Sequence, residues 1–569
     1  MKKFMRIFII ILSLVMAISF VACDAEGVPG GMEGGWGDIL DNSDGGIMMD
    51  QNNSSIAGNE TGGVSPDASV PDESPEFDEE AEEKPGEDDK AEGDEPVDTE
   101  GKVEDTETET CVIDDIKPDE PINPSPSLIT SPFINTSDIR FSTFSADVDT
   151  ASYTYFRKLI GYGYGLNELR NSGSNFRVEE FINYFRYEGK QPGEGELFGV
   201  TTSLVPCPWD ENTLLFRATL QTETPANDAP NNLVFLIDVS GSMSSSDKLP
   251  LLKKAFSYLV GNLRPNDTIS IVTYSGQEAV VLDGCSGSDS ARIMNAINSL
   301  VASGSTNGEA GLTMAYQIAE KHMKAGSNNR IIMASDGDLN VGISSTSEIT
   351  RYIEQKRDQG IYLSVLGFGT GNYRDEKMEA LADNGNGVYY YIDGESEAEK
   401  VFGTDLLGTL YTVANDVKLQ IEFNPELVDS YRLIGYDNRV LDKEDFENDA
   451  KDAGEVGAGH QVTVCYEIKL TENKQIDDDL MTLRVRYKNP GEPISRLNEY
   501  EIGAENYSEK LSDDMRFITS VVELASLLRN PGYVGDITVE SILAELDGLT
   551  LTDSYKIEFR EIVRVLAAK

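Results

Sequence analysis

The sequence predicts an α/β protein in which a doubly wound, mostly parallel sheet is inserted in or flanked by an antiparallel β-sandwich. Between residues 232 and 413, solid apolar runs alternate with helical segments, which is typical of a parallel sheet covered by helices on both faces. Segments with period-two alternation, typical of antiparallel strands, lie before and after this region. Apolar stripes at helical spacing flank these strands, so we also expect N- and C-terminal helical segments.

The first 22 residues have the organisation of an export signal. Basic residues at positions 2, 3 and 6 precede an apolar stretch over 7–20, which is too short and wrongly flanked to be an ordinary transmembrane helix. The phrase FVAC at 20–23 resembles the lipobox of bacterial lipoproteins, and this resemblance implies cleavage before Cys23 and acylation of that cysteine. The alternative is an ordinary signal peptide with an incidental cysteine. We therefore expect a protein held by lipid on the extracytoplasmic face of the cell membrane.

The segment after Cys23 is expected to be a disordered, acidic tether. It contains few apolar residues, so it cannot bury enough surface to offset its chain entropy. Residues 67–120 contain 25 acidic and 4 basic side chains, and the whole chain has a formal net charge of -53. Such a chain is a poor candidate for binding nucleic acid, because that affinity comes from Lys and Arg neutralising phosphates.

We expect six regions along the chain. They are an export signal (1–22), the tether (23–135), an N-terminal helical segment with the first strands (136–227), the parallel-sheet domain (228–415), a β-rich region (416–505) and a C-terminal helical segment (506–569). Asp149 and Thr150 are expected to cap the first helix. The early strands at 197–204 and 213–222 would be marginally stable as an isolated hairpin. We therefore expect them to pair with strands predicted within 417–487, which would make the parallel-sheet domain an insert.

Five oxygen-bearing side chains are expected to meet at the carboxyl ends of the parallel strands. The run LVFLIDVSGSM places Asp238 at a strand end and Ser240 and Ser242 in the following loop. Thr306 and Asp336 lie in two further loops of the same domain. Ligands bind at this edge of an open α/β sheet. Two carboxylates and three hydroxyls make an all-oxygen site, which suits Mg²⁺, Mn²⁺ or Ca²⁺ rather than zinc or copper.

This constellation resembles the metal-ion-dependent adhesion site of von Willebrand factor type A (VWA) domains. The resemblance implies that Ser240, Ser242 and Thr306 bind the metal, for which Mg²⁺ is expected, while Asp238 and Asp336 act through water. A metal held mainly by hydroxyls keeps its positive charge, so a carboxylate of a protein partner can complete its coordination. The phrases FSTFSADVDTASY, RVEEFINYF and DAGEVGAGH resemble the flanks of a bacterial lipoprotein family. That family has a central VWA domain and a C-terminal domain of unknown function.

The expected function is adhesion or protein binding without catalysis, and the alternative is a metal-assisted hydrolase acting on cell-envelope substrates. A hydrolase needs a general base near the metal-bound water, and we expect both histidines, His322 and His460, away from the strand tips. Glu309 is close in sequence to Thr306, but it starts a helix, where the helix dipole favours an acidic residue. The loop that begins at Asp336 fits an EF-hand poorly, because its glycine and glutamate each come one place late.

Four cysteines follow Cys23, and their spacing selects no disulfide pattern. An even number in an exported chain permits disulfides, and four cysteines allow three pairings. For Cys465, which lies in an alternating strand pattern, a buried free thiol is the alternative. The four are Cys111, Cys207, Cys285 and Cys465.

Overall fold

The computed structural model describes residues 132–569, apart from 225–228, 277, 306–307, 325, 338–345, 370–374, 478 and 530. The predicted export signal, Cys23, Cys111 and most of the predicted tether lie outside the described residues. Within the described part of the chain, every helix is too short or too polar to cross a membrane.

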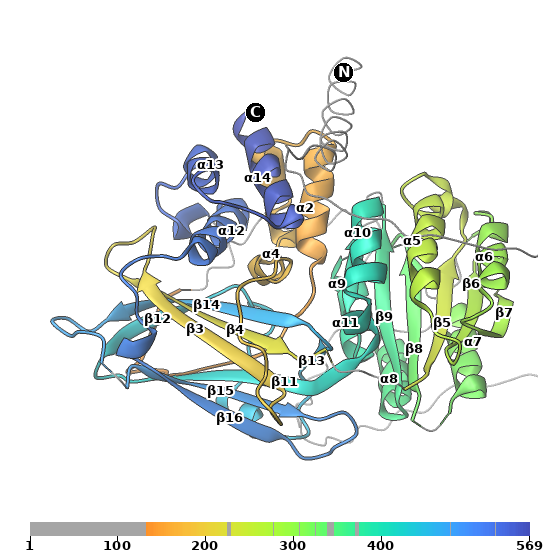
Figure 1. The fold of residues 1–569 in the computed structure, drawn as a ribbon, viewed down its shortest axis with the longest axis horizontal. Helices are drawn as coiled ribbons and strands as arrows, with labels where there is room; N and C mark the ends of the chain where they lie inside the picture. The colour runs from red at the N-terminus through yellow and green to blue at the C-terminus, as the bar shows by residue number, and fades with distance from the viewer. Residues whose placement is uncertain are drawn as a thin grey trace, which may run out of the picture. The chain divides into compact units, whose positions relative to one another are not determined.

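A six-stranded sheet lies at the centre of the predicted parallel-sheet domain, with the strand order β10-β9-β8-β5-β6-β7 (Figure 1). All neighbours are parallel except β7, which runs antiparallel to β6. The mostly parallel, doubly wound sheet predicted from the sequence is confirmed. Its strands are β5 (Asn231–Asp238), β6 (Thr268–Tyr274), β7 (Ala279–Ser286), β8 (Asn328–Ser335), β9 (Ile361–Phe368) and β10 (Tyr389–Ile392).

The solid apolar run of β5 supplies both faces of this sheet. Leu233, Phe235 and Ile237 belong to the core on one face, and Val234 and Leu236 belong to the core on the other. Successive side chains of a strand point to opposite faces, so the central residues of a strand with two covered faces are apolar without alternation. The first face is covered by α5 (Leu249–Asn262), α6 (Ser290–Ser299), α10 (Glu395–Glu399) and α11 (Leu406–Leu410); the second by α7 (Gly308–His322), α8 (Thr346–Asp358) and α9 (Asp375–Asn384).

Two five-stranded sheets pack as a β-sandwich around a separate core (Figure 1). The first has the order β1-β12-β14-β4-β3; the second has the order β13-β11-β15-β16, with β2 also paired to β11. Apolar residues alternate on the inner faces of both sheets and meet in one core, as antiparallel sandwiches require. The strands are β1 (Ile134–Asn135), β2 (Phe141–Ser145), β3 (Phe198–Pro206), β4 (Leu214–Thr222), β11 (Thr412–Phe423), β12 (Val428–Ile434), β13 (Gly454–Gly457), β14 (Gln461–Leu470), β15 (Met481–Lys488) and β16 (Arg496–Ile502).

The parallel-sheet domain is an insert in this sandwich, as predicted. Strand β4 precedes the domain and pairs with β14, which follows it, from Gln221 opposite Gln461 to Leu214 opposite Ile468. The chain therefore leaves the sandwich after β4 and returns to it at β11. The two ends of the inserted domain lie together, because the Tyr411 hydroxyl donates to the carbonyl oxygen of Ala229 at 3.4 Å.

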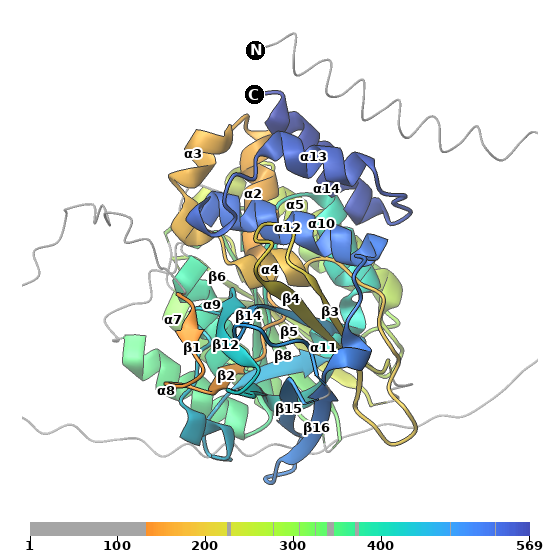
Figure 2. The ribbon, with the colours of Figure 1, turned by 90° about the vertical axis from the view of Figure 1, so that its left-hand side faces the viewer.

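Helices from the two ends of the ordered chain pack together beside the sandwich and the inserted sheet (Figures 1 and 2). Their shared core is aromatic: the ring centroids of Phe185 and Phe559 are 5.3 Å apart, and those of Tyr155 and Tyr391 in β10 are 5.7 Å apart. The helical group therefore connects the insert with the rest of the fold. The helices are α2 (Ala151–Gly161), α3 (Leu166–Arg170), α4 (Val178–Asn183), α12 (Asp513–Arg529), α13 (Val539–Asp547) and α14 (Ser554–Ala567).

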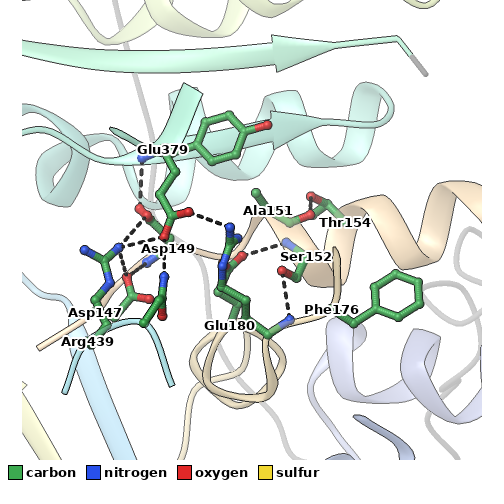
Figure 3. A network of polar contacts seen from close by, with 12 residues as sticks. Asp147, Asp149, Ala151, Ser152, Thr154, Phe176, Glu180, Glu379 and Arg439 are labelled. Atoms are coloured by element: carbon green, nitrogen blue, oxygen red, sulfur yellow. Dashed lines mark hydrogen bonds and ion pairs between the residues drawn. The ribbon is translucent and has the colours of Figure 1, made fainter. Parts of the chain in front are cut away.

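Of the two predicted caps of the first helix, Thr150 is the N-cap residue of α2 and Asp149 is not. The Thr150 side chain makes no capping hydrogen bond. The Asp149 carboxylate instead accepts the backbone N–H of Tyr389 in β10 at 2.9 Å. Glu180 of α4 accepts the N–H of Ser152 in the first turn of α2 at 2.6 Å (Figure 3). Tertiary partners have replaced the local cap.

Candidate metal site at the strand tips

Strand β5 delivers Asp238 to the edge of the inserted sheet as a buried carboxylate. The side chain is 0% exposed. Its Oδ1 atom accepts the backbone N–H of Ser240 at 2.8 Å, and Oδ2 accepts the Ser335 hydroxyl of β8 at 3.4 Å. Burial raises the pKa of Asp238 to about 6, and the Asp336 carboxylate adds to this rise while hydrogen bonds from Ser240 oppose it. A cation beside this carboxylate would favour its ionised form.

The two serines lie side by side in the turn that follows β5. Their hydroxyl oxygens are 2.9 Å apart. Ser240 is buried and Ser242 is exposed, so the pair reaches from the sheet edge to solvent. Met243 anchors this turn, because its side chain is fully buried and its N–H donates to the carbonyl oxygen of Ser240 at 3.0 Å.

Asp336 lies one residue beyond the end of β8 and is 2% exposed. Its Oδ2 atom accepts a hydrogen bond from the Lys248 ammonium at 2.8 Å. The same ammonium donates to the carbonyl oxygen of Ser242 at 3.0 Å. A positive charge of the protein therefore lies between two of the segments that carry the predicted ligands.

Sequence reasoning missed Lys248. It occupies the N-cap position of α5, where the helix dipole disfavours a cation. The unusual lysine at this position, ten residues after Asp238, is the sequence feature from which its place at the site could have been predicted. The stem of Lys248 passes against Gly369, where a Cβ atom would lie 2.2 Å from Cε of the lysine.

Thr306 lies outside the described residues, but the segment leading to it is held against the turn after β5. Ser303 donates its N–H to the carbonyl oxygen of Val239 at 2.7 Å, and Gly304 accepts the N–H of Gly241 at 3.1 Å. Gly304 has a φ of +82°, and a Cβ there would lie 2.6 Å from the Ser275 hydroxyl. The loop is therefore tied in place up to the residue before Thr306.

The described donors fit a hard divalent cation. Neighbouring ligands of an octahedral Mg²⁺, each about 2.1 Å from the metal, lie about 3.0 Å apart, and the two serine hydroxyls are 2.9 Å apart. The set contains oxygen donors and no thiolate or imidazole, which favours Mg²⁺, Mn²⁺ or Ca²⁺. Ser240 and Ser242 would hold the ion, with Asp238 and Asp336 beside them.

Both histidines make their contacts away from the strand tips. His322, at the end of α7, is hydrogen-bonded to Asp283 of β7 at 2.6 Å. His460 is buried, and burial lowers its pKa to about 4, although the Asp405 carboxylate acts in the opposite direction. A neutral, enclosed imidazole of this kind is a structural residue.

The three described cysteines are free and buried. They therefore form no disulfide with one another. Burial raises the pKa of Cys207 and of Cys465 to about 12, so both are unreactive thiols. The free-thiol alternative for Cys465 is confirmed.

Three family descriptions match this chain. The von Willebrand factor type A domain matches residues 232–404, which include every predicted metal ligand. A von Willebrand factor description matches residues 126–217, and "Uncharacterized protein YfbK, C-terminal" matches residues 408–568. The three matched segments follow one another along the chain between residues 126 and 568.

Over much of its length the chain is similar to the uncharacterized protein YfbK of Escherichia coli (strain K12). The two are 41% identical over 427 residues, which cover 70% of this chain and 73% of that protein. The chain belongs to the YfbK family. The YfbK family thus contains a VWA domain, a class of domain that mediates protein–protein interaction and commonly binds a divalent cation.

Two proteins outside the YfbK family show similarity that is confined to part of the chain or is weak. Inter-alpha-trypsin inhibitor heavy chain H3 of Pongo abelii is 27% identical over 202 residues, covering 34% of this chain and 22% of that protein. A solved von Willebrand factor type A structure from Catenulispora acidiphila has 17% identity and a TM-score of 0.37, covering 59% of this chain and 80% of that chain. These similarities assign no ligand or partner to the YfbK family.

Proposed function

We propose that this protein is a lipid-anchored, extracytoplasmic binding protein that uses the strand-tip site to bind a carboxylate of a protein partner through a divalent cation. The strand-tip site consists of Asp238, Ser240, Ser242, Thr306 and Asp336. The observation that carries the proposal is the pair of serine hydroxyls, 2.9 Å apart beside the buried Asp238. Mg²⁺ is the expected ion.

The charge of the described site favours an acidic partner. Two carboxylates, of Asp238 and Asp336, offset a divalent cation, but the Lys248 ammonium already forms an ion pair with Asp336 at 2.8 Å. The loaded site would therefore carry about one net positive charge. Serine hydroxyls bind a cation without neutralising it, so the remaining charge is available to a carboxylate of the partner.

The strand-tip site is tested with the folded part of the chain, residues 132–569, by calorimetric titration of Mg²⁺ and Mn²⁺. We expect wild type to bind one ion at the site with an affinity in the micromolar to millimolar range. Asp336→Ala removes a carboxylate from the site and should abolish this binding. Asp358→Ala is the matched control, because that side chain is 70% exposed at the end of α8. Equal binding by wild type and Asp336→Ala would contradict the proposal.

The partner and the anchor are tested in intact cells. Crosslinking should capture a protein partner with wild type and lose it both with Asp336→Ala and with a chelator. For the anchor, wild type should partition into the detergent phase, whereas Cys23→Ala should be released or remain unprocessed. A Cys23→Ala protein that partitions like wild type would exclude lipidation at this cysteine.

A further inference from the structure

We infer a second divalent-cation site, for Ca²⁺, between the inserted domain and the sandwich. It consists of Asp416 in β11, Glu455 in β13 and Asp452 in the loop before β13, and we call these three residues the junction site. One carboxylate oxygen of each residue lies within 4.8 Å of those of the other two. The junction site shares no residue with the strand-tip site and does not depend on the proposed function.

Glu455 is the residue that requires a ligand. It is 8% exposed, and its buried Oε1 atom has no hydrogen-bond partner among the described residues. An ionised carboxylate in the interior is costly unless it is paired or hydrogen-bonded. Either a proton or a cation must offset this charge.

The direct ion pairs of the junction site go to the two aspartates and not to Glu455. Lys488 donates to Asp416 at 2.6 Å, and Arg357 of α8 donates to Asp452 at 2.6 Å. Glu455 lies in the field of the Arg357 and Arg330 guanidinium groups, but it forms an ion pair with neither among the described residues. Its buried carboxylate is therefore the one member of the junction site without a direct cationic contact.

The backbone holds the three residues together independently of any ion. Strands β11 and β13 are antiparallel neighbours, and their register shifts between Ala414 and Val417, where Asp416 lies. The Asp416 carboxylate also accepts the N–H of Ala453 at 3.0 Å, which ties β11 to the loop that carries Asp452. A cation would therefore enter a largely preformed set of oxygens.

The ligand chemistry favours Ca²⁺ over Mg²⁺. All three donors are carboxylates, and Ca²⁺ accepts about six to eight oxygen ligands in flexible geometry, whereas Mg²⁺ demands a near-ideal octahedron and usually keeps several of its waters. The Asp452 side chain is 50% exposed, so water has access to complete the irregular coordination that Ca²⁺ accepts. Because Arg357 belongs to the inserted domain, the ion would strengthen the contact between that domain and the sandwich.

The test uses residues 132–569 carrying Asp336→Ala, so that a failure of the strand-tip site cannot affect the result. We expect Ca²⁺ to bind with one site by calorimetry and to raise the melting temperature by several degrees. Adding Glu455→Gln, which keeps the shape and removes the charge, should abolish both effects. Glu447→Gln, at an exposed glutamate near the junction, should leave both unchanged.

Two results would overturn the junction site. One is an absence of Ca²⁺ binding at millimolar concentration, or binding that Glu455→Gln does not reduce. The other is a higher melting temperature of Glu455→Gln than of its parent at pH 8, together with no effect of Ca²⁺ on the parent protein. That result would show that a proton alone offsets the charge of Glu455. If Asp336→Ala fails to fold, the number of Ca²⁺ ions bound by otherwise wild-type protein is compared with that of Glu455→Gln and Asp452→Asn. Both variants should bind one ion fewer.

Discussion

Lys248 places a fixed ammonium group where it competes with the cation of the strand-tip site. It donates to Asp336 at 2.8 Å and to the carbonyl oxygen of Ser242 at 3.0 Å. Two unit charges about 4 Å apart interact by about 4 kcal/mol at an effective dielectric constant of 20. The lysine therefore neutralises Asp336 in the absence of metal and weakens the hold of the site on a metal ion.

Replacing Lys248 by methionine should strengthen metal binding. Lys248→Met removes the charge and keeps most of the apolar stem, so we expect the Mn²⁺ dissociation constant of residues 132–569 to fall about tenfold or more by calorimetry. Lys254→Met is the control, because it removes the same charge from the exposed side of α5. Unchanged or weaker binding by Lys248→Met would show that the lysine positions Asp336 and does not compete with the ion.

His460 should make the fold less stable in acid. Burial lowers its pKa to about 4 from an ordinary value of 6.5, so it stays neutral in the folded protein while the unfolded chain takes up a proton below pH 6.5. The contribution of the neutral imidazole to the free energy of unfolding is present above pH 6.5 and is lost as the pH falls to about 4. The difference corresponds to about 3 kcal/mol.

The measurement compares the free energy of unfolding of wild type and His460→Asn between pH 4 and 7.5. The asparagine does not titrate, so wild type should lose about 3 kcal/mol relative to the variant as the pH falls through this range. Parallel curves would show that His460 is protonated equally in both states. Because each pH gives a difference between two proteins, titration of other groups cancels.

At the scale of elements, Arg157 of α2 connects the inserted domain to the terminal helices. It is a buried guanidinium that forms two hydrogen bonds of 2.7 Å with Asp393, after β10, and one of 2.8 Å with Glu397 of α10. It also forms an ion pair with Glu558 of α14 at 3.1 Å. One side chain thus joins three elements that are far apart in the sequence.

Removing this guanidinium should destabilise the fold strongly. Arg157→Met leaves buried carboxylates without their partner, which costs about 3 to 5 kcal/mol, and urea denaturation measures the loss. Lys254→Met is again the control, because its ion pair with Glu395 has side chains 62% and 55% exposed, so its loss should cost less than about 1 kcal/mol. Similar losses for the two variants would contradict a structural role for Arg157.

At the scale of the whole molecule, the inserted domain shares an apolar core with the terminal helices. Val234 and Tyr389 of the six-stranded sheet belong to the same buried cluster as Phe156 of α2 and Phe517 of α12. The buried network around Glu379 and Arg439 adds contacts between α9 and the loop after β12 (Figure 3). The domain is thus packed against the rest of the fold as well as connected to it by the chain.

Residues 132–569 should therefore unfold in one transition. Trp209, the one tryptophan in this part of the sequence, packs against the shared core and donates to Glu467 of β14 at 3.1 Å. Its fluorescence follows the sandwich, whereas far-UV circular dichroism follows the helices of the inserted domain as well. We expect coincident urea midpoints for wild type, and a circular dichroism transition that occurs before Trp209 emission would contradict shared unfolding.

The sequence by itself determined the elements whose signals are local. The run from Leu233 to Ile237 in β5 contains no polar residue. It could be identified as a strand buried on both faces, because such a strand lacks the alternation of apolar and polar residues. The motif from Asp238 to Ser242 follows directly from the end of that strand, so its place at the sheet edge could also be predicted. The pairing of the early strands with strands after the insert could be predicted from the instability of an isolated hairpin, although the structure alone showed that β14 is the partner of β4.

Tertiary structure alone decided which distant side chains meet. Nothing near Lys248 in the sequence indicates Asp336, which is 88 residues away, and nothing near Asp149 indicates the backbone of Tyr389. Strand β16 was missed because most of its side chains are exposed, so it lacks the apolar alternation that marks a half-buried strand. The junction site depends on the pairing of β11 with β13 and on the shift in their register around Asp416. Contacts of this kind arise from packing between elements, and packing leaves no periodic pattern in the residues that make them.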